Sequence, residues 1–245
     1  MKVSELNDFI YSFAPSSLCS EWDNTGIMIG DPSAEVSKAV LCLDVTEGAV
    51  KFAVQNGADV IISHHPLFFS DVKSITVRDR VGRAALEAIK NGIAVLSHHT
   101  NMDNSPVGLN ATFASMCGGT DIETISDGAL FNVDTTLLSL AKKISEIFKT
   151  CVKVSSGNKD RQIKKAFVVT GCGGRERSLF EFARLNADVY ITGEIKHNCF
   201  LDYDSVIEIP HYSSEIIFCD VTEKLLKGKI EVVKYFNKPF DEVKF

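Results

Sequence analysis

The sequence predicts an α/β fold: two similar, closely docked βαβ-type halves with mixed sheets flanked by helices. Three observations lead to this prediction. Short apolar runs alternate with longer segments whose apolar residues recur every three to four positions, as strands and helices do in βαβ units. Residues that favour turns, mainly glycine, asparagine and proline, separate the segments. Part of the alternation occurs twice along the chain.

The first half begins with an amphipathic helix over residues 4–13, and a polar turn over 21–26 then leads into a short strand. Strands and helices alternate after it. We expect strands at 38–44, 59–63 and 93–97, and helices at 46–56 and in the later part of 75–91.

The second half has the same character. We expect helices at 108–116, at 135–148, from the turn at 171–175 to 185, and from 211 to about 226, with strands at 165–170, 188–192, 206–209 and 231–236.

An internal repeat supports two halves. The segment 38–62 parallels 165–191, and the offset between them drifts by only two residues, which one loop can absorb. We therefore expect a first half over 1–125 and a second over 126–245. The C-terminal segment of the second half would contribute His211 and Glu215 to a shared metal site.

Composition excludes several functional classes. The chain has 245 residues, of which 45% are hydrophobic and 24% charged, as in an ordinary globular protein. Its net charge of −6 gives no strong nucleic-acid signal. The seven cysteines are scattered without a C-x-x-C pair, so we expect neither a thiolate zinc site nor a disulfide framework. No secretory signal or membrane-spanning run is recognisable, and we expect a cytoplasmic protein.

Histidines follow two of the predicted strands. His64 and His65 come directly after the strand at 59–63, and His98 and His99 after the strand at 93–97. Open α/β sheets bind ligands at the carboxyl ends of their strands. Successive side chains of a strand point to opposite faces. His64 and His65 can therefore share one site only if the chain turns at Pro66, or if they bind two neighbouring metals.

Carboxylates occur at suitable spacings from other histidines. His211 and Glu215 are four residues apart and would share one face of a helix. His99 and Asp103 have the same spacing, although the residues between them suggest a loop as readily as a helix. Imidazole and carboxylate ligands without thiolates fit zinc, iron or manganese, and a two-metal site would suit hydrolysis.

Five ordered motifs resemble one known family. The motifs are Trp22-Asp23-Asn24-x-Gly26, Ser63-His64-His65-Pro66-Leu67, His99-Thr100-Asn101-Met102-Asp103, Thr192-Gly193-Glu194-x-x-His197 and His211-Tyr212-x-Ser214-Glu215. They resemble the dinuclear-metal, ring-forming family of GTP cyclohydrolase type-two homologues, also called Nif-three-like proteins. The resemblance covers nearly the whole chain.

The resemblance implies two divalent metal ions per subunit, of zinc, iron or manganese, and no other cofactor. The ligands it implies are His64, His65, Asp103, His211 and Glu215. His99 and Glu194 would then either support the ligands from behind or face the substrate, where Glu194 or His99 could move protons.

Two further segments lie outside the implied ligand set. We expect His98 to be a polar strand-end residue. Trp22, Asp23 and Asn24 are either a core anchor with a capping aspartate or a substrate loop beside the site.

The resemblance also implies a homohexamer. It favours a metal-dependent hydrolase that uses metal-activated water on a small nucleotide-like or heterocyclic substrate. The alternative is a non-catalytic, dinuclear-metal-binding or regulatory interaction protein.

Overall fold

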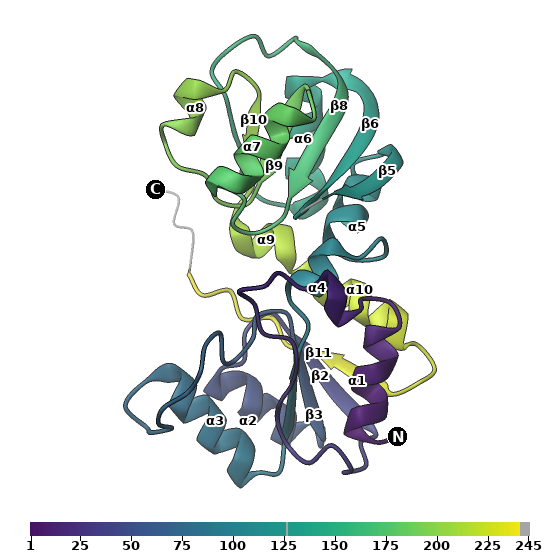
Figure 1. Cartoon of the computed structure of the whole chain (residues 1–245), viewed down its shortest axis with the longest axis vertical. Coiled ribbons are helices and arrows are strands. Elements are labelled where there is room, and N and C mark those ends of the chain that lie inside the picture. The colour runs from purple at the N-terminus through teal and green to yellow at the C-terminus, as the bar shows by residue number, and fades with distance from the viewer. Residues whose placement is uncertain (126, 241–245) are drawn as a thin grey trace. The chain divides into compact units, whose positions relative to one another are not determined.

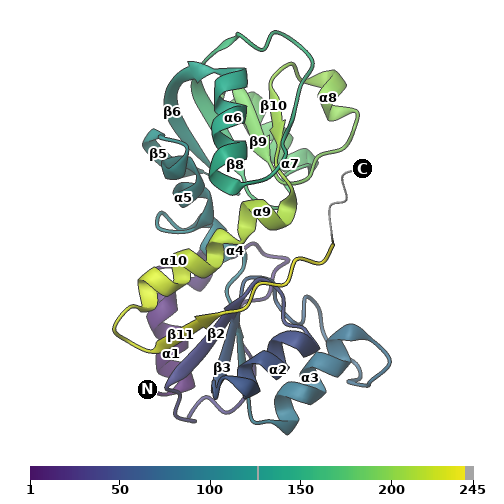
Figure 2. The ribbon, with the colours of Figure 1, turned by 180° about the vertical axis from the view of Figure 1, so that it is seen from behind.

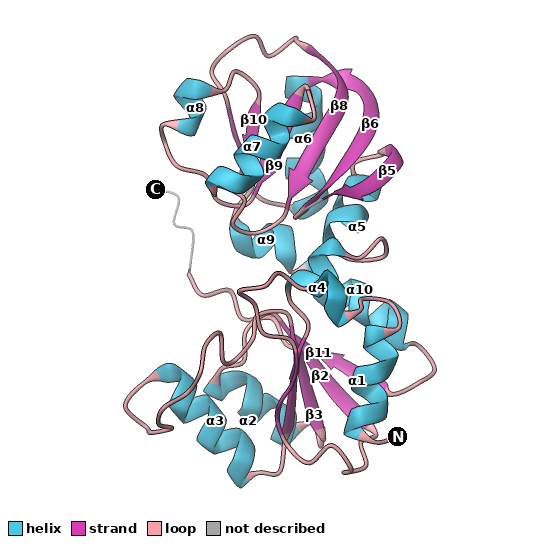
Figure 3. Ribbon diagram, viewed as in Figure 1, coloured by secondary structure: helices cyan, strands magenta, loops and turns pink. Residues whose placement is uncertain are grey.

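Two mixed β-sheets organise the chain in the computed structural model, which describes residues 1–125 and 127–240. Each sheet belongs to one of two compact units. The first unit contains the residues up to Met102 and those from Phe218 onward, and the second contains Asp103–Ile217. Both sheets are flanked by helices, so the predicted α/β class is confirmed (Figures 1 and 3).

This division differs from the sequential halves 1–125 and 126–245 that the sequence predicted. The C-terminal strand β11 (Glu231–Lys234) pairs in parallel with β2 (Lys38–Cys42), a strand of the first unit's sheet. Backbone pairing across nearly two hundred residues therefore returns the end of the chain to the first unit.

The sheet of the first unit has the order β1-β4-β3-β2-β11. Neighbouring strands are parallel except β1 (Gly26–Ile29), which is antiparallel to β4 (Ala94–Ser97). The strand β3 (Val60–Ser63) lies between β2 and β4, and all four of its residues are buried. A strand covered on both faces is expected to be mostly apolar, and Val60, Ile61 and Ile62 precede the terminal Ser63.

Helices cover both faces of this sheet. The helices α2 (Glu47–Gln55) and α3 (Arg80–Lys90) lie on one side, with α1 (Val3–Tyr11) and α10 (Ile217–Leu226) on the other (Figure 2). Alanines of α2 and α3 pack on valines and isoleucines of β2, β3 and β4 to form a core. Thr46 caps α2 by accepting a hydrogen bond from the amide of Ala49 (3.1 Å).

The sheet of the second unit has the order β5-β6-β8-β9-β10-β7. Its strands are β5 (Thr120–Ile125), β6 (Gly128–Thr136), β7 (Lys153–Val154), β8 (Gln162–Val169), β9 (Val189–Thr192) and β10 (Val206–Glu208). The neighbouring pairs β8–β9 and β9–β10 are parallel, and the pairs β5–β6, β6–β8 and β10–β7 are antiparallel.

The helices of the second unit are α5 (Leu109–Met116), α6 (Leu137–Phe148), α7 (Glu176–Arg184), α8 (Cys199–Asp202) and α9 (His211–Glu215), while α4 (Thr100–Asn104) spans its boundary with the first unit. Figures 1 and 2 show α7 and α6 on opposite faces of the sheet. Under α7, the ring of Tyr190 stacks with those of Phe167 and Phe182 at centroid distances of 5.9 and 5.2 Å.

The internal repeat has the same hydrogen bonds in both copies. The carboxylate of Asp59 accepts from the amides of Ser37 and Lys38, where β2 begins. Asp188 accepts from the amides of Lys164 and Lys165 in β8. In each copy an aspartate preceding the second strand thus holds the first strand in parallel register.

Three element predictions need correction. The strands β5, β6 and β7 were missed, and Thr135 and Thr136, predicted to begin a helix, end β6 by pairing with β8. The predicted helix from 211 to 226 is interrupted at Ile216, between α9 and α10.

Among the described residues, no helix has the length and apolar character needed to cross a bilayer.

Candidate metal site

The first unit places its histidine pair at the carboxyl end of β3. The strand ends at Ser63, whose hydroxyl donates to the carbonyl oxygen of His65 (2.8 Å) and closes a tight turn. The rings of His64 and His65 therefore lie together, with centroids 5.2 Å apart, instead of on opposite faces. The alternation of a regular strand does not apply here, because the chain turns before Pro66.

Each ring of this pair meets an oxygen acceptor. The Nδ1 atom of His64 lies 3.2 Å from the carbonyl oxygen of His98, and Nδ1 of His65 lies 3.1 Å from Oδ1 of Asp44. Carbonyl and carboxylate oxygens only accept, so Nδ1 must carry the hydrogen in both rings. This tautomer presents Nε2 as the ligand atom, as in most histidines that bind metals.

His99 is held in the same way, more tightly. Its Nδ1 atom lies 2.8 Å from Oδ1 of Asp23, and the Asp23 side chain is fully buried. Burial alone would raise the pKa of Asp23, but hydrogen bonds from His99 and Thr100 outweigh it and hold the pKa well below its usual range. Asp23 is therefore an ionised acceptor that fixes the orientation of His99.

The three rings form a compact cluster. One ligand nitrogen from each of His64, His65 and His99 lies within 4.8 Å of the other two. The ring centroids of His64 and His65 are 5.0 and 5.5 Å from that of His99. Imidazoles that converge and carry acceptors on their far nitrogens fit a site for a zinc, iron or manganese ion.

His98 belongs to a different environment. It is fully buried, and burial lowers its pKa to about 3, so the ring is neutral. The amide of Asn101, which donates to the carbonyl oxygen of Ala14, also lies 3.2 Å from Nδ1 of His98. Nδ1 therefore accepts, and His98 has the opposite tautomer from its neighbours. The ring packs edge-on against Tyr11 at 5.2 Å, as expected of a structural residue.

The motif Trp22-Asp23-Asn24 is a loop beside the cluster. Trp22 is 47% exposed, which excludes the core-anchor alternative. Its ring meets His99 edge-on at a centroid distance of 5.8 Å. Asp23 holds His99, as described, and the side-chain amide of Asn24 donates to the carbonyl oxygen of Phe68 (2.7 Å).

The second unit gathers the other predicted site residues. His211 and Glu215 are the first and last residues of α9, and Nε2 of His211 lies 2.7 Å from Oε2 of Glu215. Glu194, in the loop after β9, has its Oε1 3.0 Å from Nδ1 of His211. His197, three residues after Glu194, is exposed.

The segment after β8 brings Asp103 and Glu215 to the same place. The hydroxyl of Thr170 lies 3.5 Å from Oδ1 of Asp103, and the amide of Gly171 donates to the hydroxyl of Ser214 (2.9 Å). A Cβ atom on Gly171 would overlap Oε1 of Glu215 and lie 3.4 Å from Nε2 of His211. The predicted ligands of this unit therefore surround the turn at Thr170 and Gly171.

Three residues of this site were missed from the sequence. Asp44 bonds His65, and the only available signal was its position after β2, one strand away from the histidines. Thr170 and Gly171 were assigned only to a strand end and a tight turn, because their contacts with Asp103 and Glu215 come from distant sequence.

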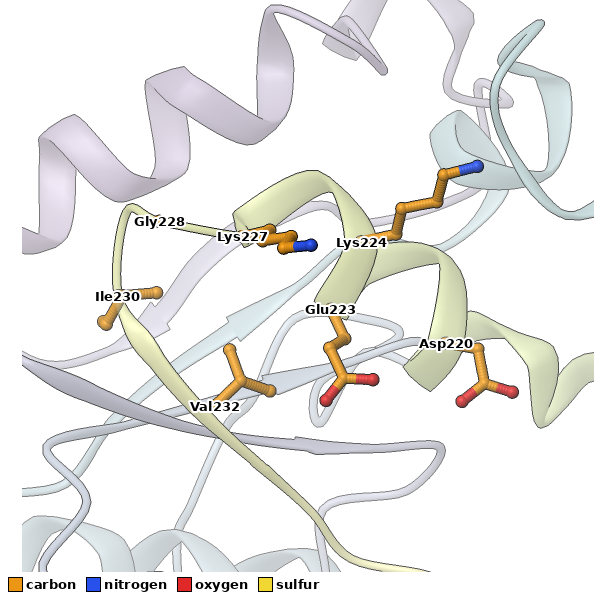
Figure 4. Close-up of a pocket in the computed structure, with 7 residues that line it drawn as sticks. All are labelled: Asp220, Glu223, Lys224, Lys227, Gly228, Ile230 and Val232. Carbon is orange, nitrogen blue, oxygen red and sulfur yellow. The ribbon is translucent and has the colours of Figure 1, made fainter.

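A pocket elsewhere in the first unit has no histidine among its lining residues. It has a volume of about 490 Å³ and lies between α10 and β11 (Figure 4). Its lining residues are Asp220, Glu223, Lys224, Lys227, Gly228, Ile230 and Val232. The ammonium group of Lys234 donates to both Asp220 and Glu223, so these carboxylates already have a cation.

Comparison with known proteins gives the family. The model of the Duf34/NIF3 family (NGG1p interacting factor 3) matches residues 1–239. The chain belongs to this family.

Relatives of the Duf34/NIF3 family match the chain over nearly its full length. A GTP cyclohydrolase 1 type 2 homolog from Clostridium perfringens is 31% identical, with 98% of this chain and 99% of the relative covered. The homolog of the same name from Lactococcus lactis is 32% identical over 92% and 91%. The predicted family is thus confirmed.

Solved structures share the fold. A Staphylococcus aureus hypothetical protein has a TM-score of 0.90 at 26% identity, with 99% of both chains covered. A Bacillus cereus protein related to NIF3 has a TM-score of 0.88 over the same shares, and at 19% identity it supports the fold alone.

Proposed function

We propose that the protein is a metal-dependent hydrolase that acts on a small nucleotide-like or heterocyclic substrate. The observation that carries this proposal is the cluster of His64, His65 and His99, in which one nitrogen of each ring lies within 4.8 Å of the other two. It places the His99 ring beside the two proposed histidine ligands. The oxygen acceptors on Nδ1 of all three rings support it further, because orienting acceptors are typical of histidines that bind metals.

We propose two divalent metal ions per subunit, of zinc, iron or manganese. The proposed ligands are His64, His65, Asp103, His211 and Glu215, as the family resemblance implies. Metals bound by imidazole and carboxylate groups activate water for hydrolysis near neutral pH. Glu215 is deeply buried, and a buried carboxylate requires a cation or several hydrogen-bond donors. It is therefore suited to be a metal ligand.

His99 and Glu194 are proposed to move protons. Asp23 fixes His99 with the hydrogen on Nδ1, so Nε2 can accept a proton from the attacking water. Glu194 has 56% of its side chain exposed, so it can exchange protons with solvent while Oε1 stays 3.0 Å from His211. Trp22, Asp23 and Asn24 form the proposed substrate loop.

The test of the hydrolase proposal is metal-dependent turnover of candidate substrates. Purified, metal-loaded protein would be incubated with GTP and a panel of nucleotides and free heterocycles, and products would be separated by chromatography. We expect a metal-dependent product from at least one compound. If none yields such a product, the hydrolase proposal fails.

A variant pair tests the ligand assignment. Glu215→Gln should reduce both metal content and turnover. Glu181→Gln is the matched control, because Glu181 pairs with Arg184 on the surface helix α7. Unchanged metal content in Glu215→Gln would contradict the assignment of Glu215 as a ligand.

A second candidate is a metal-binding interaction protein without catalysis. The family description, which names an interacting factor, favours it. In that case a protein partner would co-purify in stoichiometric amount, and the metal-loaded protein would leave every compound of the panel unchanged.

We further propose a cytoplasmic homohexamer, on the strength of the family resemblance. Light scattering coupled to size-exclusion chromatography measures the mass directly. A monomer of 26.9 kDa at micromolar concentration would contradict the proposed assembly.

A further inference from the structure

We infer that Trp22 and Phe69 form an aromatic collar around His99, and that this collar stacks a planar heteroaromatic ring of the substrate. The inference rests on the proposed function, because it names the substrate class of the same site. It assigns a binding role to Phe69, which none of the sequence motifs includes.

Both collar rings contact the same imidazole. The ring of Trp22 lies edge-on to His99 at a centroid distance of 5.8 Å and an interplanar angle of 77°. The ring of Phe69 lies 5.6 Å from His99 at 90°. His99 in turn contacts His64 and His65, so the collar is continuous with the candidate metal ligands.

The collar is exposed where the histidines are not. Trp22 is 47% and Phe69 50% exposed, whereas His64 is fully buried and His99 only 8% exposed. Large aromatic rings dominate binding energetics, because each removes a large apolar area from water when a ligand covers it. A flat ligand placed against them would cover this surface and reach the histidine cluster.

Hydrogen bonds tie together the two segments that carry the collar rings. The side-chain amide of Asn24 donates to the carbonyl oxygen of Phe68, so the Trp22 loop is tied to the segment that carries Phe69. The carboxylate of Asp23 accepts from the backbone amide of Asn24 (2.8 Å) and lies 2.8 Å from Nδ1 of His99. Preformed geometry lowers the ordering cost of binding, as expected for a ligand site.

The aromatic rings favour a flat ligand. Stacking on aromatic faces is open to any planar base, because every base has a π-face. A ring held against Trp22 and Phe69 would lie beside the imidazole of His99, which both of them contact.

The single tryptophan makes a direct test. Trp22 is the only tryptophan of the chain, so intrinsic fluorescence reports on the collar alone. Guanosine, adenosine and uridine would be titrated into the purified protein, both as isolated and after chelator treatment, with ribose 5-phosphate as the non-aromatic probe. We expect saturable quenching by at least one nucleoside and none by ribose 5-phosphate. Quenching by ribose 5-phosphate alone, or by no probe at millimolar concentration, would overturn the inference.

Variants separate the ring from its volume. Phe69→Ala and Phe69→Leu should both weaken nucleoside binding, by about five-fold to about a hundred-fold, because both remove the stacking face. Phe180→Ala is the control, since Phe180 is 68% exposed on α7 in the second unit. Equal affinity in the wild type and both Phe69 variants, with circular dichroism unchanged, would overturn the role of Phe69.

Binding and turnover measurements together distinguish failure of the collar inference from failure of the hydrolase proposal. Nucleoside binding that depends on Phe69, together with no hydrolysis of any compound, would refute the proposed hydrolase while leaving the collar intact. Hydrolysis that persists unchanged in Phe69→Ala, in substrate affinity and rate, would refute the collar alone.

Discussion

Replacing Gly171 by alanine tests whether Glu215 is a ligand without altering Glu215 itself. The new Cβ atom would overlap Oε1 of Glu215 and lie 2.7 Å from its Cδ atom. The Glu215 carboxylate would have to leave its present position, because the backbone of Gly171 is held by the hydroxyl of Ser214. His211, 3.4 Å from the same Cβ, would be crowded as well.

Two costs can be separated with a matched control. Gly171 has φ of +67°, a conformation that costs an alanine roughly 1–2 kcal/mol. Gly92 also has φ of +67°, but a Cβ placed there meets nothing within 4 Å. Gly92→Ala therefore reports backbone strain alone. Gly92→Ala should lose about 1–2 kcal/mol of unfolding free energy and Gly171→Ala at least as much, and only Gly171→Ala should lose metal affinity.

The affinity would be measured by competition with a chromogenic chelator. Loss of a partner that merely orients a ligand lowers metal affinity about 10- to 100-fold, so displacement of Glu215 itself should cost at least that much. Equal metal affinity in Gly171→Ala, Gly92→Ala and the wild type would refute the assignment of Glu215.

Two further predictions concern the histidines. Asp44→Ala removes the acceptor on Nδ1 of His65 and should lower metal affinity by about 10- to 100-fold; Asp31→Ala, on an exposed turn with Ser33, should leave it unchanged in the same chelator competition. The pKa of His98 is about 3 in the folded protein and about 6.5 when unfolded, so the unfolded state takes up a proton first and stability is lost as pH falls from about 6.5 towards about 3. The advantage of the wild type over His98→Gln in unfolding free energy, measured by urea unfolding, should therefore shrink by up to about 1.4 kcal/mol per pH unit in that range. An equal advantage at pH 7 and pH 5 would contradict the assignment of His98 as buried and neutral.

Residues close together in sequence were predictable. The βαβ repeat was visible because a buried parallel strand is apolar along most of its length, as residues 60–62 of β3 and 189–191 of β9 are. The family and its five motifs were also recognisable before the structure was known, and the family match over residues 1–239 agrees.

Elements that depend on distant pairing were not predictable. The strand β5 is polar and partly exposed, so it has no apolar run, and only its pairing with β6 reveals it. Likewise, β11 looked like the end of the second half until its parallel pairing with β2 was known.

The site shows the same limit. His64 and His65 were identified from their position at a strand end, which is a local signal. Asp44 and Phe69 acquire their roles only through contacts with His65 and His99, which no spacing in the sequence encodes. The orienting and covering groups of a site are therefore harder to predict than its candidate ligands.

The most direct test of the metal proposal is anomalous X-ray scattering from crystals of the protein carrying its native metals. We predict peaks at coordination distance from Nε2 of both His64 and His65, at an absorption edge of zinc, iron or manganese. Crystals that give no anomalous peak at these histidines, from protein shown to contain stoichiometric metal, would contradict the proposal.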